Sequence, residues 1–296
     1  MAAFRGAVEA GAHAIETDLH LSKDGVVVLA HVPSPPLLPL STHNIDIPPQ
    51  DPSLKRTFGI NKKVADCDWA YLSTLRTPRP PHEPLARLSD LLKYIAQPAL
   101  SSIWLLLDIK LTDDPTTLLT AIAATLSSTP ALPSHPWHQR VLLGCWTSEY
   151  TTLAAHLLPS YPLSHIGFSH LHATPFLANP SVTAYNIMYL ALVGPLGRRF
   201  VRAIGERSPS AAVFAWTVNG EYWMRWCVST GRVDGVVTDD PKAMGEVCRR
   251  WGAGERGGEG GGEEGGGGGG GAGGDDGFGG GVLGEVEGGR RGRRGV

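Results

Sequence analysis

The chain has 296 residues, 42% of them hydrophobic and 18% charged, and its formal net charge is −2 at pH 7. This balance excludes the strong positive field of a dedicated nucleic-acid-binding protein. No stretch reaches the roughly 20 apolar residues of a membrane span, so any membrane contact is expected to be peripheral. The four cysteines show no CxxC or metal-ligand spacing, and the N-terminus reads as an amphipathic helix rather than a signal peptide. These features predict an intracellular, cytoplasmic protein with reduced thiols.

The most informative stretch is residues 14–31, AIETDLHLSKDGVVVLAH. Apolar and polar residues alternate at its start, which predicts a strand with Glu16 and Asp18 on the same face. An Asp-Gly turn returns the chain through a β-branched run that ends at His31. Paired carboxylates suit a hard cation such as Mg²⁺ or Ca²⁺, and an imidazole suits proton transfer. Acids alternating on a strand are more often its solvent-facing side, so the stretch alone leaves both interpretations open.

The next segment, residues 32–50, contains six prolines and is predicted to be an irregular insert. After it, strands and helices alternate with short connections. Strands are expected at 102–110, 139–146, 164–169, 181–189, 211–218 and 233–238. Helices are expected at 2–10, 85–94, 116–127, 150–158, 195–205, 221–230 and 241–250.

This alternation predicts an α/β fold with a parallel sheet, either a TIM (β/α)₈ barrel or a doubly wound sheet. No GxGxxG motif follows the first strand, which argues against a dinucleotide-binding fold. About 250 residues suit one barrel domain, residues 1–250. The Gly-rich segment 251–296 cannot bury enough apolar surface to fold and is predicted to be a disordered tail.

Active residues of a barrel lie where its strands end. The polar or aromatic residues at predicted strand ends are Glu16, Asp18, Asp108, Lys110, Trp216 and Asp239. Their occurrence on several separate strands favours a site over a chance pattern. Asp239 and the following Asp240 are more simply interpreted as helix N-caps.

Taken together, the pieces GAHAIETDLHLSKDGVVVLAH, DPSLKRTFG, LLLDIK, AWTVN and VDGVVTDDP resemble the glycerophosphodiester phosphodiesterase family. The likeness is closest to its fungal branch, the phosphatidylglycerol-specific phospholipases C. The resemblance spans residues 3 to about 248, and its first and last pieces are the specific ones. It implies a (β/α)₈ barrel, one divalent cation, Mg²⁺ or Ca²⁺, and hydrolysis of glycerophosphodiesters or glycerophospholipids in lipid metabolism.

The resemblance also implies roles for individual residues. Glu16 and Asp18 would ligate the cation, with Asp108 where much of the family has Glu. His31 matches the second catalytic histidine of the family, and Lys110 would lie beside the phosphate as a catalytic and substrate-binding residue. Trp216 would wall the glycerol pocket; a barrel-lining aromatic is an equally good interpretation. In the family, a neighbouring substrate hydroxyl is thought to attack first, giving a cyclic phosphate that water then opens.

The sequence departs from the family pattern in two places. The His-Arg-Gly motif of the first barrel strand is absent, which predicts an N-terminally truncated, incomplete barrel with two unpaired edges. Family members also read His-Asp where His31 is followed by Val32, and joining His31 to Asp51 restores that pair. We hypothesise that residues 32–50 are translated intron, because Val32 requires a GT codon start. Transcripts that retain this stretch as the dominant message would refute the hypothesis.

Three functions therefore compete. The first is a metal-dependent glycerophosphodiesterase or phospholipase C. The second is a catalytically impaired remnant of the same fold, at most a binding module, because one member of the acid/base pair is missing. The third is a different barrel hydrolase, which is weakened by the absence of an HxH or HExxH ligand set.

Overall fold

The computed structural model describes residues 1–30, 53–254 and 282–285. The insert at 32–50 and His31 lie outside the described residues, as does the tail apart from 282–285. The strands are β1 (Ala14–Leu21), β2 (Val27–Leu29), β3 (Ala86–Arg87), β4 (Trp104–Ile109), β5 (Val141–Cys145), β6 (Leu163–Gly167), β7 (Val182–Met188), β8 (Ala212–Trp216), β9 (Gly235–Thr238) and β10 (Val282–Glu285).

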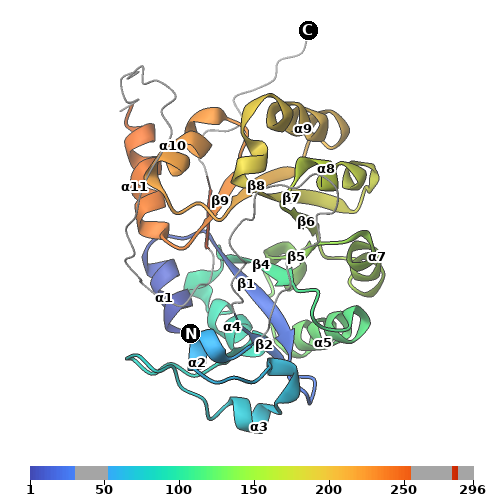
Figure 1. The fold of residues 1–296 in the computed structure, drawn as a ribbon, viewed down its shortest axis with the longest axis vertical. Helices are drawn as coiled ribbons and strands as arrows, with labels where there is room; N and C mark the ends of the chain where they lie inside the picture. The colour runs from blue at the N-terminus through green and yellow to red at the C-terminus, as the bar shows by residue number, and fades with distance from the viewer. Residues whose placement is uncertain (31–52, 255–281, 286–296) are drawn as a thin grey trace.

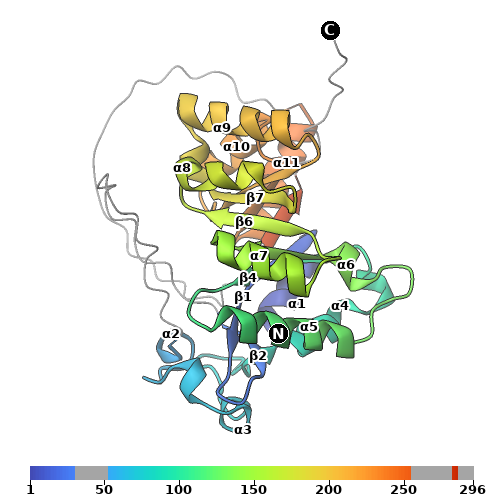
Figure 2. The same cartoon turned by 90° about the vertical axis from the view of Figure 1, so that its right-hand side faces the viewer.

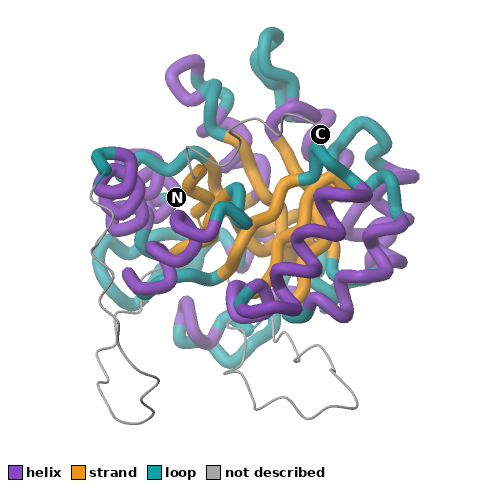
Figure 3. The backbone as a smooth tube through the Cα atoms, turned by 90° about the horizontal axis from the view of Figure 1, so that it is seen from above, coloured by secondary structure: helices purple, strands orange, loops and turns teal. Residues whose placement is uncertain are grey.

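Seven of these strands run parallel around a barrel in the order β1, β4, β5, β6, β7, β8 and β9 (Figures 1 and 3). The barrel is closed by β10, which pairs antiparallel with both β9 and β1. The two edges that the sequence predicted to be unpaired are therefore both hydrogen-bonded. The TIM-barrel prediction is confirmed, and the closing strand comes from the Gly-rich region, where no strand was expected.

Helices surround the strands, as the view from above shows (Figure 3). They are α1 (Ala2–Glu9), α2 (Lys55–Phe58), α3 (Trp69–Leu72), α4 (Leu88–Ile95), α5 (Pro115–Ser128), α6 (Trp137–Arg140), α7 (Ser148–Leu157), α8 (His170–Ala173), α9 (Gly194–Arg207), α10 (Glu221–Thr230) and α11 (Pro241–Gly252). None of the helices in the described part of the chain is long and apolar enough to cross a bilayer.

Local sequence explains where several helices begin and end. Asp114 caps α5 by accepting a hydrogen bond from the Thr117 amide at 2.8 Å, and Pro115 is the first residue of the helix. Asp240 caps α11 in the same way through the Ala243 amide, as predicted. Gly231 ends α10 with a φ of 60°, a left-handed conformation that glycine adopts without strain.

The apolar residues of the barrel form two outer cores and one inner layer. The first outer core joins β1, β2, β4 and β5 to helices α1, α4, α5 and α7, within residues 4–163. The second joins β7, β8 and β9 to α9, α10 and α11, within residues 173–247. In Figure 2 these two groups of helices occupy different ends of the molecule. The inner layer comprises Ala14, Leu106, Leu142, Ala184, Phe214 and Val237.

A buried arginine ties the N-terminal end of β4 to its surroundings. The Arg140 guanidinium donates to the backbone carbonyls of Ile95, Leu100 and Ile103 at 2.6 to 2.9 Å. These carbonyls flank the turn before β4, so Arg140 fixes where that strand enters the barrel. The site described next lies at the other end of the same strand.

Candidate active site

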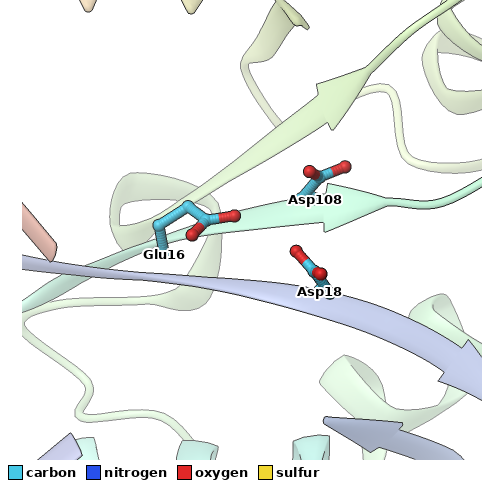
Figure 4. A group of neighbouring side chains, drawn as sticks. All are labelled: Glu16, Asp18 and Asp108. Atoms are coloured by element: carbon cyan, nitrogen blue, oxygen red, sulfur yellow. The ribbon is translucent and has the colours of Figure 1, made fainter. Parts of the chain in front are cut away.

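Three buried acids meet at the carboxyl ends of β1 and β4. Parallel pairing places Asp18 directly beside Asp108, and Glu16 lies two residues earlier on the same face of β1. One carboxylate oxygen from each acid lies within 4.8 Å of the others, and all three side chains point into one space (Figure 4). Their exposed fractions are only 9%, 4% and 4% for Glu16, Asp18 and Asp108. The structure thus brings together the three acids proposed from the sequence.

A lysine supplies the counter-charge of this cluster. The Lys110 ammonium nitrogen lies 2.5 Å from Oδ2 of Asp108 and 3.1 Å from Oδ1 of Asp18. Burial opposes the charge on Lys110, but the carboxylates of Asp108, Asp18 and Glu16 outweigh it and raise the lysine pKa above its usual value. Lys110 therefore stays protonated at neutral pH. It can offset negative charge but cannot act as a general base there.

The pKa values of two of the acids are raised as well, which for a carboxyl group disfavours the charged form. Burial, followed by the charges of Asp18 and Asp108, raises the pKa of Glu16 well above its ordinary value. The pKa of Asp108 is also raised, chiefly by burial, although Lys110 and a hydrogen bond from Trp146 oppose the shift. Within the described residues, Lys110 forms ion pairs with Asp18 and Asp108, so three acids and one ammonium carry surplus negative charge when all are ionised. This surplus is what a bound cation would neutralise.

Aromatic rings form one wall of the pocket. The Trp146 indole nitrogen donates to Oδ1 of Asp108 at 2.7 Å, which fixes the carboxylate. The rings of Trp146, Phe168 and Trp216 contact one another with centroids 5.1 to 5.8 Å apart. Rings this close leave no room for a group between them, so they form a wall rather than a cage. The predicted residue Trp216 does line the pocket, and its indole donates to the Asn186 carbonyl.

An asparagine on β7 contributes a polar group to the same pocket. Asn186 is 3% exposed, and its side-chain oxygen accepts no hydrogen bond within the described part of the chain. A buried acceptor without a donor is costly unless a ligand satisfies it. Asn186 therefore points to a ligand with a hydroxyl or other donor. Sequence reasoning placed this residue within a strand but gave no reason to select it.

A second residue missed from the sequence is His20, two positions after Asp18 on β1. Its Nδ1 lies 3.2 Å from Oγ1 of Thr112 and 3.4 Å from Oδ2 of Asp113, both in the loop after β4. The ring is fully buried. These contacts anchor the β4–α5 loop beside the acids. The alternation that selected Glu16 and Asp18 also places His20 on their face, so the signal was present.

The remaining candidate residues from the sequence are His31, Asp239 and Asp240. His31 lies outside the described residues, so its catalytic role stays a prediction. Asp239 is exposed and accepts a hydrogen bond from the Asn219 side-chain amide at 2.6 Å, and it is not a helix N-cap as predicted, because the cap of α11 is Asp240. Its neighbour Asp240 caps α11 and takes no part in the pocket.

The donor set fits a hard divalent cation. All three ligating groups are carboxylates, and their oxygens lie within the span that one ion bound on opposite sides covers, about 4 to 5 Å for Mg²⁺ or Ca²⁺. No histidine or cysteine belongs to the described cluster, which disfavours zinc. The three acids line a pocket together with Lys110, Trp146, Asn186 and Trp216.

Comparisons with known proteins agree with this geometry. The sequence profile of the Glycerophosphoryl diester phosphodiesterase family matches residues 1–243. No curated protein matches significantly. Several solved structures share the fold. One is a glycerophosphoryl diester phosphodiesterase from Silicibacter pomeroyi, with 19% identity and a TM-score of 0.64, covering 84% of this chain and 87% of that one.

Two further structures show the same arrangement. An Oleispira antarctica phosphodiesterase, solved with its product sn-glycerol-3-phosphate, has 17% identity and a TM-score of 0.64 over 81% of this chain and 87% of its own. The Thermotoga maritima glycerophosphodiester phosphodiesterase has 19% identity and a TM-score of 0.59 over 82% and 89%. At these identities the structures establish the fold, whereas the profile establishes the family.

Proposed function

This chain belongs to the glycerophosphoryl diester phosphodiesterase family, a family of hydrolases, and we propose that it is a metal-dependent enzyme that cleaves phosphodiesters carrying a glycerol. The observation that carries the proposal is the convergence of Glu16, Asp18 and Asp108 on one point beside Lys110. Glu16, Asp18 and Asp108 would hold one divalent cation, Mg²⁺ or Ca²⁺. When bound, the cation polarises a phosphoryl oxygen.

The protein's own side chains would perform the other tasks. Lys110 keeps its proton because three carboxylates surround it, so it offers a fixed positive charge to the phosphate. Trp146 holds the carboxylate of Asp108 in place through its indole N–H. Asn186 offers a side-chain oxygen that a glycerol hydroxyl can satisfy, and Trp216 presents an apolar face to the glycerol carbons. His31 is proposed to transfer a proton to or from the reacting oxygens.

The aromatic wall and the family resemblance bear on which glycerol phosphodiester is cleaved. Trp146 and Trp216 give the otherwise largely polar pocket one aromatic side, which would contact the glycerol carbons that soluble diesters and phospholipids share. The resemblance to fungal phosphatidylglycerol-specific phospholipases C is what supports a glycerophospholipid substrate. The product would then be a phosphorylated headgroup and a lipid alcohol, formed as water adds and one P–O bond breaks. A role in lipid metabolism follows from that substrate.

A second candidate is a binding module without turnover. Among the described residues, no histidine lines the pocket that holds Glu16, Asp18 and Asp108. Removing one member of a catalytic pair removes most of its rate. Such a chain would still bind a cation and a phosphodiester through the residues described above.

One assay separates these candidates. The full chain is incubated with glycerophosphoglycerol or with phosphatidylglycerol, in Mg²⁺, in Ca²⁺ and in EDTA, and the release of phosphate monoester is measured. We expect hydrolysis that EDTA abolishes and that Asp18→Asn reduces by about 10²-fold or more. Asp240→Asn is the matched control, because asparagine also caps a helix and Asp240 lies outside the pocket. Cation binding without hydrolysis of either substrate would favour the binding module.

A further inference from the structure

Large apolar side chains are exposed in the segments that follow β6, β7 and β8. Among the described residues, five large hydrophobic side chains are exposed, and four of them lie above β6, β7 and β8. These four form what we call the apolar rim: Leu171 (69% exposed), Leu190 (41%), Leu196 (60%) and Tyr222 (71%). The fifth, Tyr71, lies on α3 at the opposite end of the long axis (Figure 1).

The order of the elements places the rim on the face where the acids lie. Leu171 is on α8, which begins three residues after β6 ends. Leu190 is in the 3₁₀ turn Tyr189–Leu192 directly after β7, and Leu196 is in the first turn of α9 that follows it. Tyr222 is the second residue of α10, which begins five residues after β8 ends. Because these strands are parallel, all four side chains lie at the carboxyl end of the barrel, where active sites are found.

Aromatic residues occur both in the rim segments and in the pocket. Trp223 lies with its ring centroid 5.0 Å from both Tyr189 and Tyr222, which joins the turn after β7 to α10. Phe168 packs against the pocket-lining residues Trp146 and Trp216 and precedes the rim residue Leu171 by three positions. The segments that follow β6, β7 and β8 therefore carry apolar groups both near the pocket and on the exposed surface. Scattered surface leucines need no explanation, but such a grouping beside a site does.

The same region carries a net positive charge, although the chain as a whole is slightly negative. Residues 168–232 contain six arginines and two glutamates, with no lysine or aspartate, so their net charge is +4 in a chain whose total is −2. Arg198, Arg199 and Arg202 are exposed on α9, beside the rim residue Leu196. One of the two glutamates, Glu221, is already paired with Arg250 at 3.2 Å. The surface thus combines exposed apolar groups with unbalanced positive charge.

We propose that the apolar rim and the α9 arginines form a docking surface for an anionic phospholipid bilayer. Leucine and tyrosine side chains enter the boundary between headgroups and acyl chains, while arginines remain at the level of the phosphates. A bilayer seated on this face brings lipid phosphodiesters to the mouth of the pocket. The inference deepens the proposed function and rests on it for the identity of the site. The docking itself requires no turnover.

Vesicle co-sedimentation tests the docking. The full chain in EDTA is mixed with vesicles of phosphatidylcholine alone or with phosphatidylglycerol added, and bound protein is measured at low and high salt. We expect binding to the anionic vesicles that weakens as salt rises, because salt screens the arginines. The triple variant Leu171→Ser, Leu196→Ser, Tyr222→Ser should bind about tenfold more weakly or worse. Arg198→Gln with Arg199→Gln should lose the preference for anionic vesicles.

Tyr71→Ser is the matched control. It removes a tyrosine side chain that is 36% exposed on α3, at the far end of the molecule, and the variant should bind like the parent. The thermal midpoints of all variants are compared, and because the rim side chains are exposed, the midpoints should remain close to that of the parent. Equal binding by the parent and the triple variant would overturn the proposal. The proposal would also be overturned if Tyr71→Ser weakened vesicle binding as much as the triple variant does, because the contact would then be non-specific.

A hydrolysis arm keeps the two proposals separate. Docking predicts that the triple variant loses more activity on vesicle phosphatidylglycerol than on soluble glycerophosphoglycerol. Rim-dependent vesicle binding without hydrolysis of either substrate would overturn the proposed function and support the docking surface. Hydrolysis of the soluble diester without vesicle binding would support the proposed function and overturn the docking surface. Binding of a second protein at the rim, with no vesicle binding, would also reject the lipid surface.

Discussion

The ammonium nitrogen of Lys110 lies 3.1 Å from Oδ1 of Asp18, although one residue follows β4 and the other belongs to β1. A second contact, at 2.5 Å, joins the same nitrogen to Asp108. One buried cationic side chain therefore holds together acids from two neighbouring strands. This arrangement lets the protein keep a strongly acidic pocket without a bound ion, and it sets the response of the site to substitution and to pH.

Lys110→Met should destabilise the protein and abolish hydrolysis. Removing the ammonium deletes its ion pairs with Asp18 and Asp108 and increases the uncompensated negative charge of a buried site, which costs about 3–5 kcal/mol when one member of a buried pair is deleted. Urea unfolding at neutral pH in EDTA measures the loss. Lys93→Met is the control, because Lys93 is exposed on α4. An unchanged unfolding free energy in Lys110→Met would show that the ion pairs are not formed.

Glu16→Gln should stabilise the protein without metal, and more so at higher pH. The pKa of Glu16 is raised in the folded state, chiefly by burial, so the folded protein loses stability as pH rises above the ordinary glutamate range. Glutamine removes that loss. We expect a higher thermal midpoint for the variant in EDTA at about pH 8, and no difference below about pH 4.

The same substitution should weaken cation binding, since it removes one ligand. Titration calorimetry with Ca²⁺ or Mg²⁺ measures this effect. A midpoint that shifts equally at all pH values would indicate that Glu16 has an ordinary pKa. A variant that is more stable yet binds the ion less well would show that the acids are kept for function rather than for folding.

Trp146→Phe should lower activity more than Trp216→Phe. Both changes keep an aromatic ring in the pocket wall, but the first removes the hydrogen bond to the Asp108 carboxylate and the second removes one to a backbone carbonyl. A hydrogen bond to a charged group contributes about 1.5–3 kcal/mol, which corresponds to roughly ten- to a hundredfold in rate or cation affinity. Steady-state kinetics compares the two variants. Equal losses of activity in the two variants would show that the indole N–H of Trp146 makes no special contribution to the reaction.

Deleting residues 255–296 should destabilise the barrel, because it removes β10 and leaves β1 and β9 as open edges. The lost ladder hydrogen bonds correspond to roughly 2–5 kcal/mol. Thermal unfolding and light scattering measure the loss and any edge-to-edge association. Leu283→Pro in the full chain should reproduce part of the effect, and Leu283→Thr should not, since only proline lacks the amide hydrogen. An unchanged midpoint for the deletion would show that the barrel does not need β10.

Sequence periodicity was enough for most of the barrel. The run before Asp108 is continuously apolar because β4 is buried on both faces, and the alternation around Glu16 selected the face that lines the pocket. The closing strand β10 was not predictable in this way. It is four residues long and lies among glycines, so its pairing depends on the open edges of β1 and β9 and not on its own propensity.

The sequence predicted those site residues whose side chains are charged and lie at strand ends. Carboxylates and a lysine at strand ends are conspicuous, whereas Asn186 and Trp146 resemble ordinary strand residues until a fold places them in a pocket. Helix α4 shows the same limit. An amphipathic pattern over 85–94 fits its interior, but Ala86 and Arg87 pair with β2 instead, and the helix begins at Leu88.

The division of the outer apolar residues into two cores has a consequence for how the molecule fluctuates. Glu16, Asp18, Asp108 and Lys110 come from the part of the chain built on the first core, and Asn186 and Trp216 from the part built on the second. Each half buries its own surface and can act as a separate cooperative unit in hydrogen exchange. The candidate active site therefore lies where these two units meet. A transient opening of either half would dismantle it while leaving the other half, and much of the helical signal, intact.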